Sequence, residues 1–305
     1  MPLLIVDTDG ASDDAAALLM AARSPDLAAV TVTGGVVALH QAVANVLVIL
    51  AVAGRGDVPV YAGAERSLVG DPFPGAEEVH GPGGLGGHRF EPPARTVERA
   101  PATDALGRLV DAGPALLLTL GPMTNLAVAL ARDPALAASG LRVVAMAGSQ
   151  DAVGNVTAVA EYNVACDPEA AAAVVASGLD VTLVGWDVSR RDALIGYGER
   201  DRLRRLPSSR AAFLTHVTEF LDRFCRVEQG LPGYDLPDAA AAAVALYPSV
   251  VRHAERLPVA VETSGRLTRG MTVVDHRGGV PATATIVWSI DHNAFVDHLV
   301  AALTD

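Results

Sequence analysis

The chain has 305 residues, and its 35 acidic against 23 basic side chains give a formal charge of −12. This acidity argues against a nucleic-acid partner, because binding a polyanion calls for clustered basic residues. Half of the residues are hydrophobic, which is enough for a sizeable core and excludes a disordered chain. We expect one large α/β domain or two small ones.

Two residue counts exclude further chemistries. All 23 basic residues are arginine, so no lysine can form a Schiff base with pyridoxal phosphate or a carbonyl substrate. The two cysteines, Cys166 and Cys225, are too few for a disulfide framework or a CxxC zinc site, which fits a reducing compartment. The first apolar run is too short for a signal peptide or a membrane span. We therefore expect a soluble, cytoplasmic protein with no membrane partner.

Short apolar runs alternate with longer alanine- and leucine-rich stretches along most of the chain. The runs predict strands at 3–6, 29–33, 58–61, 116–120, 143–146 and 181–184. The stretches predict helices at about 13–23, 38–53, 123–131, 168–177, 210–227 and 238–247. This alternation predicts an open, mostly parallel, Rossmann-like sheet with helices on both faces.

Two segments depart from the alternation. Near the C-terminus, the sequence predicts strands at 257–263, 271–274 and 283–288 and a helix near 292–303. We interpret them as an extension of the same domain and expect a single domain over 1–305. The segment 70–93 has no regular periodicity and contains the sequence HGPGGLGG. Long irregular segments of compact domains are often lids or binding loops, which makes this segment the expected active-site loop.

Four carboxylates, Asp7, Asp9, Asp13 and Asp14, follow directly on the first strand. Ligands of open parallel sheets bind at the carboxyl ends of the strands. Four acids so close together repel one another without a cation, and their hard oxygens, without His or Cys, suit calcium or magnesium. An ordinary helix cap with a first-turn acid is the alternative, but it accounts for only two of the four.

The stretch DTDGASDDA at 7–15 resembles the DxDxxxDDA signature of the nucleoside hydrolases of the inosine-uridine-preferring type, which cleave the N-glycosidic bond of ribonucleosides. Further similar stretches occur in the same order and at similar spacing. They are DVPVYAG at 57–63, HG at 80–81, GLG at 84–86, GPMTN at 121–125, GNVT at 154–157 and AEYN at 160–163. The likeness runs from residue 3 to about 250, and this collinearity is more specific than any single motif.

The resemblance implies a calcium site and a small-molecule nucleoside substrate. Asp9, Asp14 and Asp238 would be carboxylate ligands of Ca²⁺, Thr124 would add its backbone carbonyl, and Asp9 would also be the general base that takes a proton from water. Asp7 would support the ligands from behind. Relatives are typically dimers or tetramers, so the resemblance also implies a homo-oligomer.

The resemblance assigns the substrate contacts as well. Asp13 and Asn163 would hold the ribose 2′-hydroxyl, and Asn155 and Glu161 the 5′-hydroxyl. His80 would approach the sugar or base when the glycine-rich loop closes, and we count it as a catalytic candidate; an exposed, inert loop histidine is the alternative.

Three positions depart from the family pattern, one of which is Gly10-Ala11 in place of a common Pro-Gly. Well-known members have histidine, a general acid, directly before the late ligand, where this chain has Pro237. Gly35-Val36-Val37 replaces the common Gly-Asn-Val and so removes an amide near the substrate. These three changes indicate a divergent enzyme, and a modified nucleoside is a candidate substrate.

The sequence leaves two possible roles for each of the residues expected near the base. Trp186 follows a strand and is a candidate pocket residue, with a core position as the alternative. Tyr234 and Asp235 precede the helix of Asp238 and are candidates to stack on or protonate the base, with a turn as the alternative.

Two other functions compete with the hydrolase. Asp7-Thr8-Asp9-Gly10 also resembles the DxDG opening of haloacid-dehalogenase-type phosphohydrolases, in which Asp7 would attack phosphorus and Asp9 would act as acid and base. That family normally needs a lysine, which this chain lacks. A catalytically inactive ribose- or nucleoside-binding protein is the second alternative, because Pro237 removes the usual acid.

Overall fold

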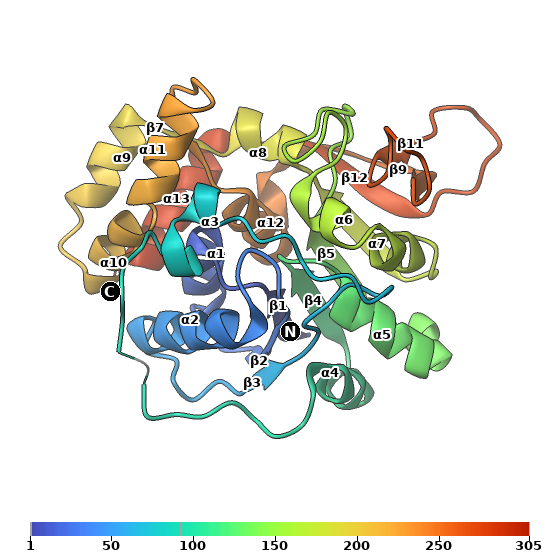
Figure 1. Cartoon of the computed structure of the whole chain (residues 1–305), viewed down its shortest axis with the longest axis horizontal. Helices are drawn as coiled ribbons and strands as arrows, with labels where there is room; N and C mark the ends of the chain where they lie inside the picture. Colours follow the sequence, from blue (N-terminus) through green and yellow to red (C-terminus); the bar gives the residue numbers. More distant parts are fainter. Residues whose placement is uncertain (1, 92, 305) are drawn as a thin grey trace.

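The computed structural model describes residues 2–91 and 93–304. Eight strands of this part of the chain form the central sheet (Figure 1). They are β1 (Leu3–Thr8), β2 (Leu27–Val32), β3 (Val60–Ala62), β4 (Ala115–Thr119), β5 (Arg142–Met146), β6 (Asp180–Val184), β9 (Val251–Leu257) and β12 (Ala284–Ile290). Their order is β3-β2-β1-β4-β5-β6-β12-β9, and every neighbouring pair is parallel except β12 with β9. The predicted single α/β domain with a mostly parallel sheet is confirmed.

Helices cover both faces of the sheet, as Figure 1 shows. One face packs against α1 (Ser12–Ala21), α2 (Leu39–Val52), α10 (Ser209–Val217), α12 (Pro237–Leu246) and α13 (His292–Leu303). The other face packs against α4 (Ala102–Asp111), α5 (Thr124–Arg132) and α7 (Pro168–Val175). Successive strand residues point to opposite faces, so Leu4 and Val6 belong to the first core and Ile5 to the second. Buried on both faces, β1 reads as a continuous apolar run.

The remaining elements lie around this framework. The helices are α3 (Glu77–His80), α6 (Tyr162–Cys166), α8 (Trp186–Asp192), α9 (Tyr197–Arg204) and α11 (Glu219–Val227), with short 3₁₀ turns η1 (Pro82–Gly84), η2 (Pro134–Ala138) and η3 (Pro248–Val250). Two antiparallel pairs join β7 (Leu194–Gly196) to β8 (Gly233–Asp235) and β10 (Val259–Val261) to β11 (Thr272–Val274).

The chain reverses its direction of travel across the sheet beside β1. After β1 it adds β2 and β3 on one side, and then it returns to place β4 on the other side, with Asp7 opposite Thr119. Helices that follow neighbouring strands on opposite faces leave a crevice between them at such a point, and ligands bind there in open α/β sheets. The acidic residues that follow β1 therefore enter this crevice.

Several predicted elements differ from the structure in detail. The helix predicted over 210–227 is two helices, α10 and α11, which meet at Thr218, whose hydroxyl donates to the Leu214 carbonyl at 2.8 Å. The strand predicted over 257–263 is divided between β9 and β10 by Pro258, which has no N–H for a ladder. β9 itself is an edge strand whose exposed, charged residues carry no apolar pattern. The expected loop at 70–93, of which residue 92 lies outside the described residues, contains α3 and η1.

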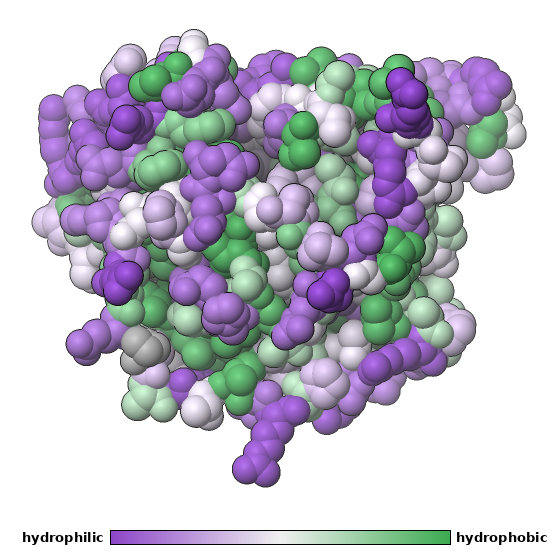
Figure 2. Space-filling model, in the orientation of Figure 1, coloured by the Kyte–Doolittle hydropathy of each residue, from purple (hydrophilic) through white to green (hydrophobic). Residues whose placement is uncertain are grey.

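Hydrophilic and apolar side chains are interspersed over the face seen in Figure 2. Within the described residues, no helix combines the length and the apolar character that a bilayer span requires.

Candidate active site and metal centre

A cavity of about 400 Å³ lies beyond the carboxyl ends of β1, β4 and β5. It brings together most of the residues that the sequence singled out, from parts of the chain far apart in sequence. Its wall includes Asp9, Asp13, Asp14, His80, Asn155, Glu161, Asn163, Trp186 and Asp238. Two other candidates, Thr124 and Tyr234, lie outside this wall.

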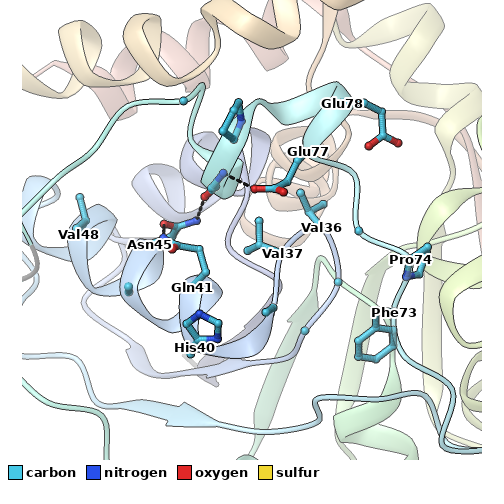
Figure 3. Close-up of a pocket in the computed structure, with 18 of the residues that line it drawn as sticks. Val36, Val37, His40, Gln41, Asn45, Val48, Phe73, Pro74, Glu77 and Glu78 are labelled. Atoms are coloured by element: carbon cyan, nitrogen blue, oxygen red, sulfur yellow. Dashed lines mark hydrogen bonds between the residues drawn. The ribbon is translucent and has the colours of Figure 1, made fainter.

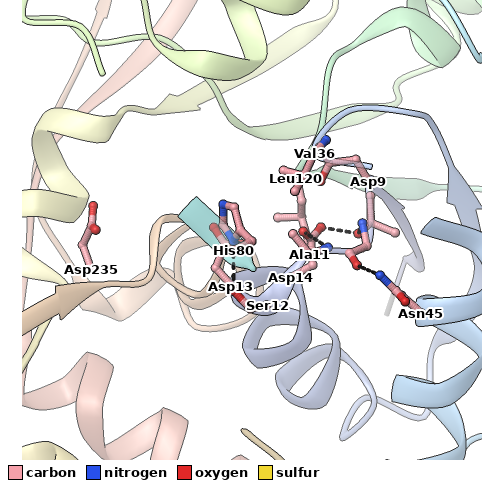
Figure 4. A network of polar contacts seen from close by, with 12 residues as sticks. Asp9, Ala11, Ser12, Asp13, Asp14, Val36, Asn45, His80, Leu120 and Asp235 are labelled. Carbon is pink, nitrogen blue, oxygen red and sulfur yellow. Dashed lines mark hydrogen bonds and ion pairs between the residues drawn. The ribbon is translucent and has the colours of Figure 1, made fainter. Parts of the chain in front are cut away.

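A cluster of buried carboxylates forms one side of the cavity. Oxygen atoms of Asp13, Asp14 and Asp238 lie within 4.8 Å of one another. Asp14 and Asp238 come from the first turns of α1 and α12, which pack together over the sheet. The Thr8 hydroxyl and the Ala11 N–H, at 2.7 Å, both donate to the Asp14 carboxylate and fix its orientation (Figure 4).

Asp9 lies beside this cluster and is held from the neighbouring strand. Its Oδ2 accepts a hydrogen bond from the Val36 N–H at 2.8 Å (Figure 4). The turn after β2 approaches so closely that a Cβ on Gly35 would lie 2.0 Å from the same oxygen. Only glycine fits there, so the glycine pair that follows β2 shapes the position of the Asp9 carboxylate.

The charge of the cluster favours a cation. Burial is the main cause that raises the pKa of Asp9, Asp13, Asp14 and Asp238. Repulsion by neighbouring carboxylates adds to it, from within this group for Asp9, Asp14 and Asp238 and from Asp235 for Asp13. Among the described residues that line the cavity there is no arginine to balance them. Ionised carboxylates are costly to bury without a partner, and an all-oxygen donor set suits a hard divalent ion. The residues present therefore fit a metal such as Ca²⁺.

His80 faces the cluster from α3. Its Nδ1 lies 2.9 Å from Ser12 Oγ and 3.3 Å from Asp13 Oδ1. Burial lowers the pKa of His80 to about 4, although Asp14, Asp235 and Glu78 oppose the shift. The ring is therefore neutral near pH 7, so its contact with Asp13 is not an ion pair, and its hydrogen-bond partner is the Ser12 hydroxyl. The histidine of the glycine-rich loop is a buried wall residue, not a solvated one.

The glycine-rich turn after His80 holds that position. Gly81 has φ +80°, and a Cβ there would lie 2.8 Å from the Gly86 backbone. Gly86 has φ +69°, and a Cβ on it would lie 2.9 Å from the Val217 carbonyl. The glycines let the loop fold on itself and pack against the end of α10.

Glu161 and Asn163 are fixed by backbone groups. Glu161 caps α6, and its carboxylate accepts from the N–H groups of Asn163 at 2.8 Å, Gly148 at 2.9 Å and Val164 at 3.2 Å. Burial raises its pKa to about 7 in spite of these three donors. The Asn163 amide donates to the carbonyls of Leu120 and Met146, at 2.7 and 3.0 Å. Both hydrogens are thus engaged, and the Asn163 Oδ1 remains as an acceptor.

Asn155 is an exposed residue of the loop between β5 and α6, and it reaches the same cavity wall. Thr124 begins α5 instead, where its hydroxyl donates to Asp167 at 2.6 Å.

Trp186 and Asp235 lie on the opposite side of the cavity. The sequence had left the role of Asp235 undecided between a base contact and a turn. Trp186 begins α8, and its Nε1 donates to Asp235 Oδ2 at 2.9 Å. Asp235 ends β8 and lines the cavity, whereas Tyr234 is buried in the core. Neighbouring residues of a strand point to opposite faces, so only one of this pair can face the cavity. The pairing of β8 with β7 decides which of the two residues faces the cavity, and the sequence alone did not reveal this pairing.

Asp7 lies behind the cavity wall and is fully buried. Its Oδ1 accepts from the Thr31 hydroxyl at 2.6 Å and from the Asn125 amide at 2.8 Å. A carboxylate enclosed in this way cannot approach a phosphoryl group, which argues against the phosphohydrolase alternative.

A second, larger cavity of about 950 Å³ lies between α2 and the segment 72–90 (Figure 3). Asn45 donates to the carbonyls of Gly10 and Gly83, both at 2.8 Å, and so ties α2 to both loops. The acidic side chains of its wall, Glu65, Glu77 and Glu78, are exposed rather than buried together. The chemically distinctive cavity is therefore the smaller one.

Comparison with known proteins gives a consistent result. Residues 4–297 match the model of the family described as inosine-uridine preferring nucleoside hydrolase. The chain is 36% identical to the pyrimidine-specific ribonucleoside hydrolase RihA of Enterobacter sp. (strain 638) and 34% identical to that of Klebsiella pneumoniae (strain 342), over 98% of this chain and 97% of each relative.

Solved structures agree with the sequence relatives. A plant nucleoside hydrolase, the PpNRh1 enzyme, superposes with a TM-score of 0.92 at 28% identity, covering 99% of this chain and 98% of the other. A purine-preferring ribonucleoside hydrolase from Gardnerella vaginalis superposes with a TM-score of 0.91 at 30% identity, over 98% and 97%. The chain belongs to the family of inosine-uridine preferring nucleoside hydrolases, and its enzyme class is therefore that of the N-glycosyl hydrolases.

Proposed function

We propose that the chain hydrolyses the N-glycosidic bond of a ribonucleoside to ribose and free base in a Ca²⁺-dependent reaction. The observation that carries this proposal is the buried cluster of Asp13, Asp14 and Asp238 in a cavity whose lining, within the described residues, contains no arginine. The family match supplies the reaction class, and the cluster supplies the reason for a metal.

Asp9, Asp14 and Asp238 would hold the ion, and the backbone carbonyl of Thr124 remains a predicted further ligand. When bound, a divalent ion holds and polarises oxygen ligands and offsets the repulsion between the carboxylates. Carboxylate oxygens are the donors that Ca²⁺ prefers, and the cluster offers no sulfur or nitrogen that would select zinc.

Asp9 is the proposed general base. Its Oδ2 is held by the Val36 N–H, which leaves Oδ1 to accept a proton from the attacking water. The raised pKa of Asp9 makes the carboxylate more basic than a solvated aspartate. Cleavage of an N-glycoside builds positive charge on the ribose, and the surrounding carboxylates stabilise that charge electrostatically.

The ribose would lie between the acidic cluster and the ends of β4 and β5. Asp13, at the edge of the cluster, and Asn163, whose free Oδ1 is held in place by two amide hydrogen bonds, are proposed to bind the 2′-hydroxyl. Asn155 and Glu161 are proposed to bind the 5′-hydroxyl. Glu161 already accepts three backbone N–H groups, so its main contribution is to position α6 and Asn163.

The base would extend toward His80 and Trp186. Both residues line the cavity, and the indole offers an apolar face on which a planar base can stack. The sequence relatives are named pyrimidine-specific and one of the similar structures purine-preferring. Pro237 and Val36 depart from the family pattern, so modified nucleosides belong among the substrates tested.

The deciding experiment is reducing-sugar release from a panel of purine, pyrimidine and modified ribonucleosides, with Ca²⁺ and with a chelator. We expect cleavage of at least one nucleoside, and loss of that activity on chelation followed by recovery with Ca²⁺. Binding of nucleosides without any cleavage would favour the nucleoside-binding alternative instead. Activity that is unchanged after complete removal of divalent ions would contradict the Ca²⁺ dependence.

We also propose a homo-oligomer, a dimer or tetramer, as the resemblance implies. Sedimentation equilibrium measures this assembly directly, and a monomer at micromolar concentration would contradict it.

A further inference from the structure

Departure of a nucleobase needs a proton or a strong hydrogen bond, because the leaving nitrogen gains the electron pair of the broken bond. Pro237 has no acidic hydrogen and occupies the position where, by the resemblance, well-known relatives carry a histidine. We propose that Asp235 is the catalytic residue that protonates the departing base. This inference rests on the proposed N-glycosidic hydrolysis and names the acid for it.

The antiparallel pairing of β8 with β7 places Asp235 in the cavity. Asp235 pairs with Leu194 and Tyr234 with Ile195 in this antiparallel ladder. The alternation along β8 sends Tyr234 into the core and Asp235 into the cavity wall. In Figure 4, His80 is seen between Asp235 on one side and Asp9 and Asp14 on the other. An acid for the base has to lie away from the groups that hold the ion and the water, and Asp235 does.

The hydrogen bonds of Asp235 leave one oxygen for the substrate. Oδ2 accepts from Trp186 Nε1 at 2.9 Å and from Ser189 Oγ at 3.3 Å. An indole N–H is a donor only, so a neutral Asp235 carries its hydrogen on Oδ1. The neighbour of Oδ1 is the Cys225 thiol, 3.8 Å away, which is a weak partner. The Oδ1 hydrogen can therefore be transferred to a base in the cavity.

The surroundings favour the protonated form of Asp235. Burial raises its pKa, while the hydrogen bonds from Trp186 and Ser189 and the nearby His80 oppose the rise. The titratable groups that face it are Asp13, His80 and Cys225. None of them is a cation at neutral pH, because burial lowers the pKa of His80 to about 4.

His80 is the other candidate acid, and it is less suitable. Its low pKa means that the ring carries no extra proton at neutral pH, and its Nδ1 already contacts Ser12 and Asp13. The pKa of Asp235 is shifted in the opposite direction, because burial raises it, so this carboxyl holds its proton to higher pH than a solvated aspartate does.

The reaction balances when Asp235 starts protonated and Asp9 starts ionised. The C1′–N bond breaks and its electron pair goes to the base nitrogen system, which receives the proton of Asp235. The water oxygen bonds to C1′, and the water proton goes to Asp9. A later transfer of one proton from Asp9 to Asp235 through solvent restores both groups, so the net reaction consumes one water and releases ribose and base.

The test compares leaving groups that differ in their need for a proton. The Ca²⁺-loaded full chain, with and without Asp235→Asn, is assayed on inosine and uridine and on 4-nitrophenyl β-D-ribofuranoside. Nitrophenolate departs without protonation, whereas a nucleobase does not. We expect Asp235→Asn to lower kcat/KM for the nucleoside by about 10²- to 10⁴-fold, the usual contribution of a general acid, and for the nitrophenyl riboside by less than about threefold.

The controls separate catalysis from structure and from the proposed function. Asp201→Asn, an exposed aspartate of α9, should leave both rates unchanged. Equal losses on both substrates would show a structural role for Asp235 and overturn the proposal, as would an unchanged nucleoside rate. A wild-type enzyme that cleaves neither substrate class would contradict the proposed hydrolysis itself. Cleavage of the nitrophenyl riboside but of no nucleoside by wild type would retain the hydrolase and overturn the acid.

A second measurement does not depend on the folding of the variant. In the wild type, the ratio of kcat/KM for the nucleoside to that for the nitrophenyl riboside should fall tenfold per pH unit once Asp235 ionises. Titration of Asp9 or of the metal ligands affects both substrates and cancels in the ratio. A ratio that is constant from pH 5 to pH 9 would overturn the proposal.

Discussion

The carboxylates of Asp14 and Asp238 lie within 4.8 Å of each other at the first turns of two packed helices. Burial and the nearby Asp13 and Asp14 raise the pKa of Asp238. Repulsion between buried carboxylates destabilises the folded protein unless a bound cation offsets it. The same residues should therefore control both the stability of the protein and its affinity for the metal.

We therefore expect Asp238→Asn to act in opposite directions with and without Ca²⁺. In the metal-free protein the variant should be at least as stable as wild type at pH 7.5, because one repelling charge is removed. With Ca²⁺, wild type should gain several degrees in Tm and the variant much less, with a Kd at least about tenfold higher. Calorimetry with a Ca²⁺ titration measures both effects. The exposed Asp201→Asn should behave as wild type, and equal Ca²⁺ stabilisation of Asp238→Asn would contradict the metal site.

The second prediction concerns the general base. Asp9→Ala should lower kcat by at least about 10²-fold for every substrate, including 4-nitrophenyl riboside, because activation of water is needed whatever group leaves. Asp111→Ala, an exposed aspartate of α4, is the matched control. Steady-state kinetics at saturating Ca²⁺ provide the measurement. Near-normal turnover by Asp9→Ala would exclude the proposed mechanism.

The sheet and the early acidic turn could be predicted because their signals are local. A buried parallel strand is a continuous apolar run, and β1 and the acids that follow it lie within one short stretch. β9 could not be predicted in this way, since an exposed edge strand of charged residues has no apolar periodicity. The break at Thr218 within the predicted helix depends on a hydrogen bond to Leu214, which apolar spacing does not encode.

The far side of the site depends on contacts that are not local. Asp235 faces the cavity because β8 pairs with β7 in one register. A shift of this register by one residue would have pointed Tyr234 into the cavity instead. The likeness to the nucleoside hydrolases placed Asp238 beside the acidic turn, which spacing alone could not do. The sequence named Gly35 only as part of Gly35-Val36-Val37 and gave it no role beside Asp9, because its closeness to Asp9 appears only when two neighbouring strands are aligned.

Gly35 gives the third prediction. An added Cβ would lie 2.0 Å from Asp9 Oδ2 and must displace the carboxylate or the turn. We expect Gly35→Ala to destabilise the protein by about 1–3 kcal/mol, as overpacking does, and to lower kcat/KM at least about tenfold. The matched control is Gly56→Ala, where no atom of the described residues lies within 4 Å of the added methyl group. Urea unfolding and kinetics on both variants check the prediction, and wild-type activity in Gly35→Ala would show that the turn does not position Asp9.

The fourth prediction is a pH dependence of stability at Glu161. Burial raises the pKa of this carboxyl from 4.5 to about 7 in the folded protein. Between these values the unfolded chain has lost the proton and the folded protein still holds it. Raising the pH therefore favours unfolding: the contribution is complete below about pH 4.5 and is lost as the pH rises toward 7, by up to about 1.4 kcal/mol per pH unit.

Glu161→Gln isolates this contribution because glutamine does not titrate. The variant carries a fixed penalty, since its amide replaces one acceptor oxygen among three backbone N–H donors. Its free energy of unfolding relative to wild type should nevertheless rise between pH 4.5 and 7 and be constant outside that window. The exposed Glu219→Gln should give a curve parallel to that of wild type. Urea unfolding at half-unit pH steps supplies the data, and parallel curves for Glu161→Gln and wild type would mean that Glu161 is ionised throughout the window.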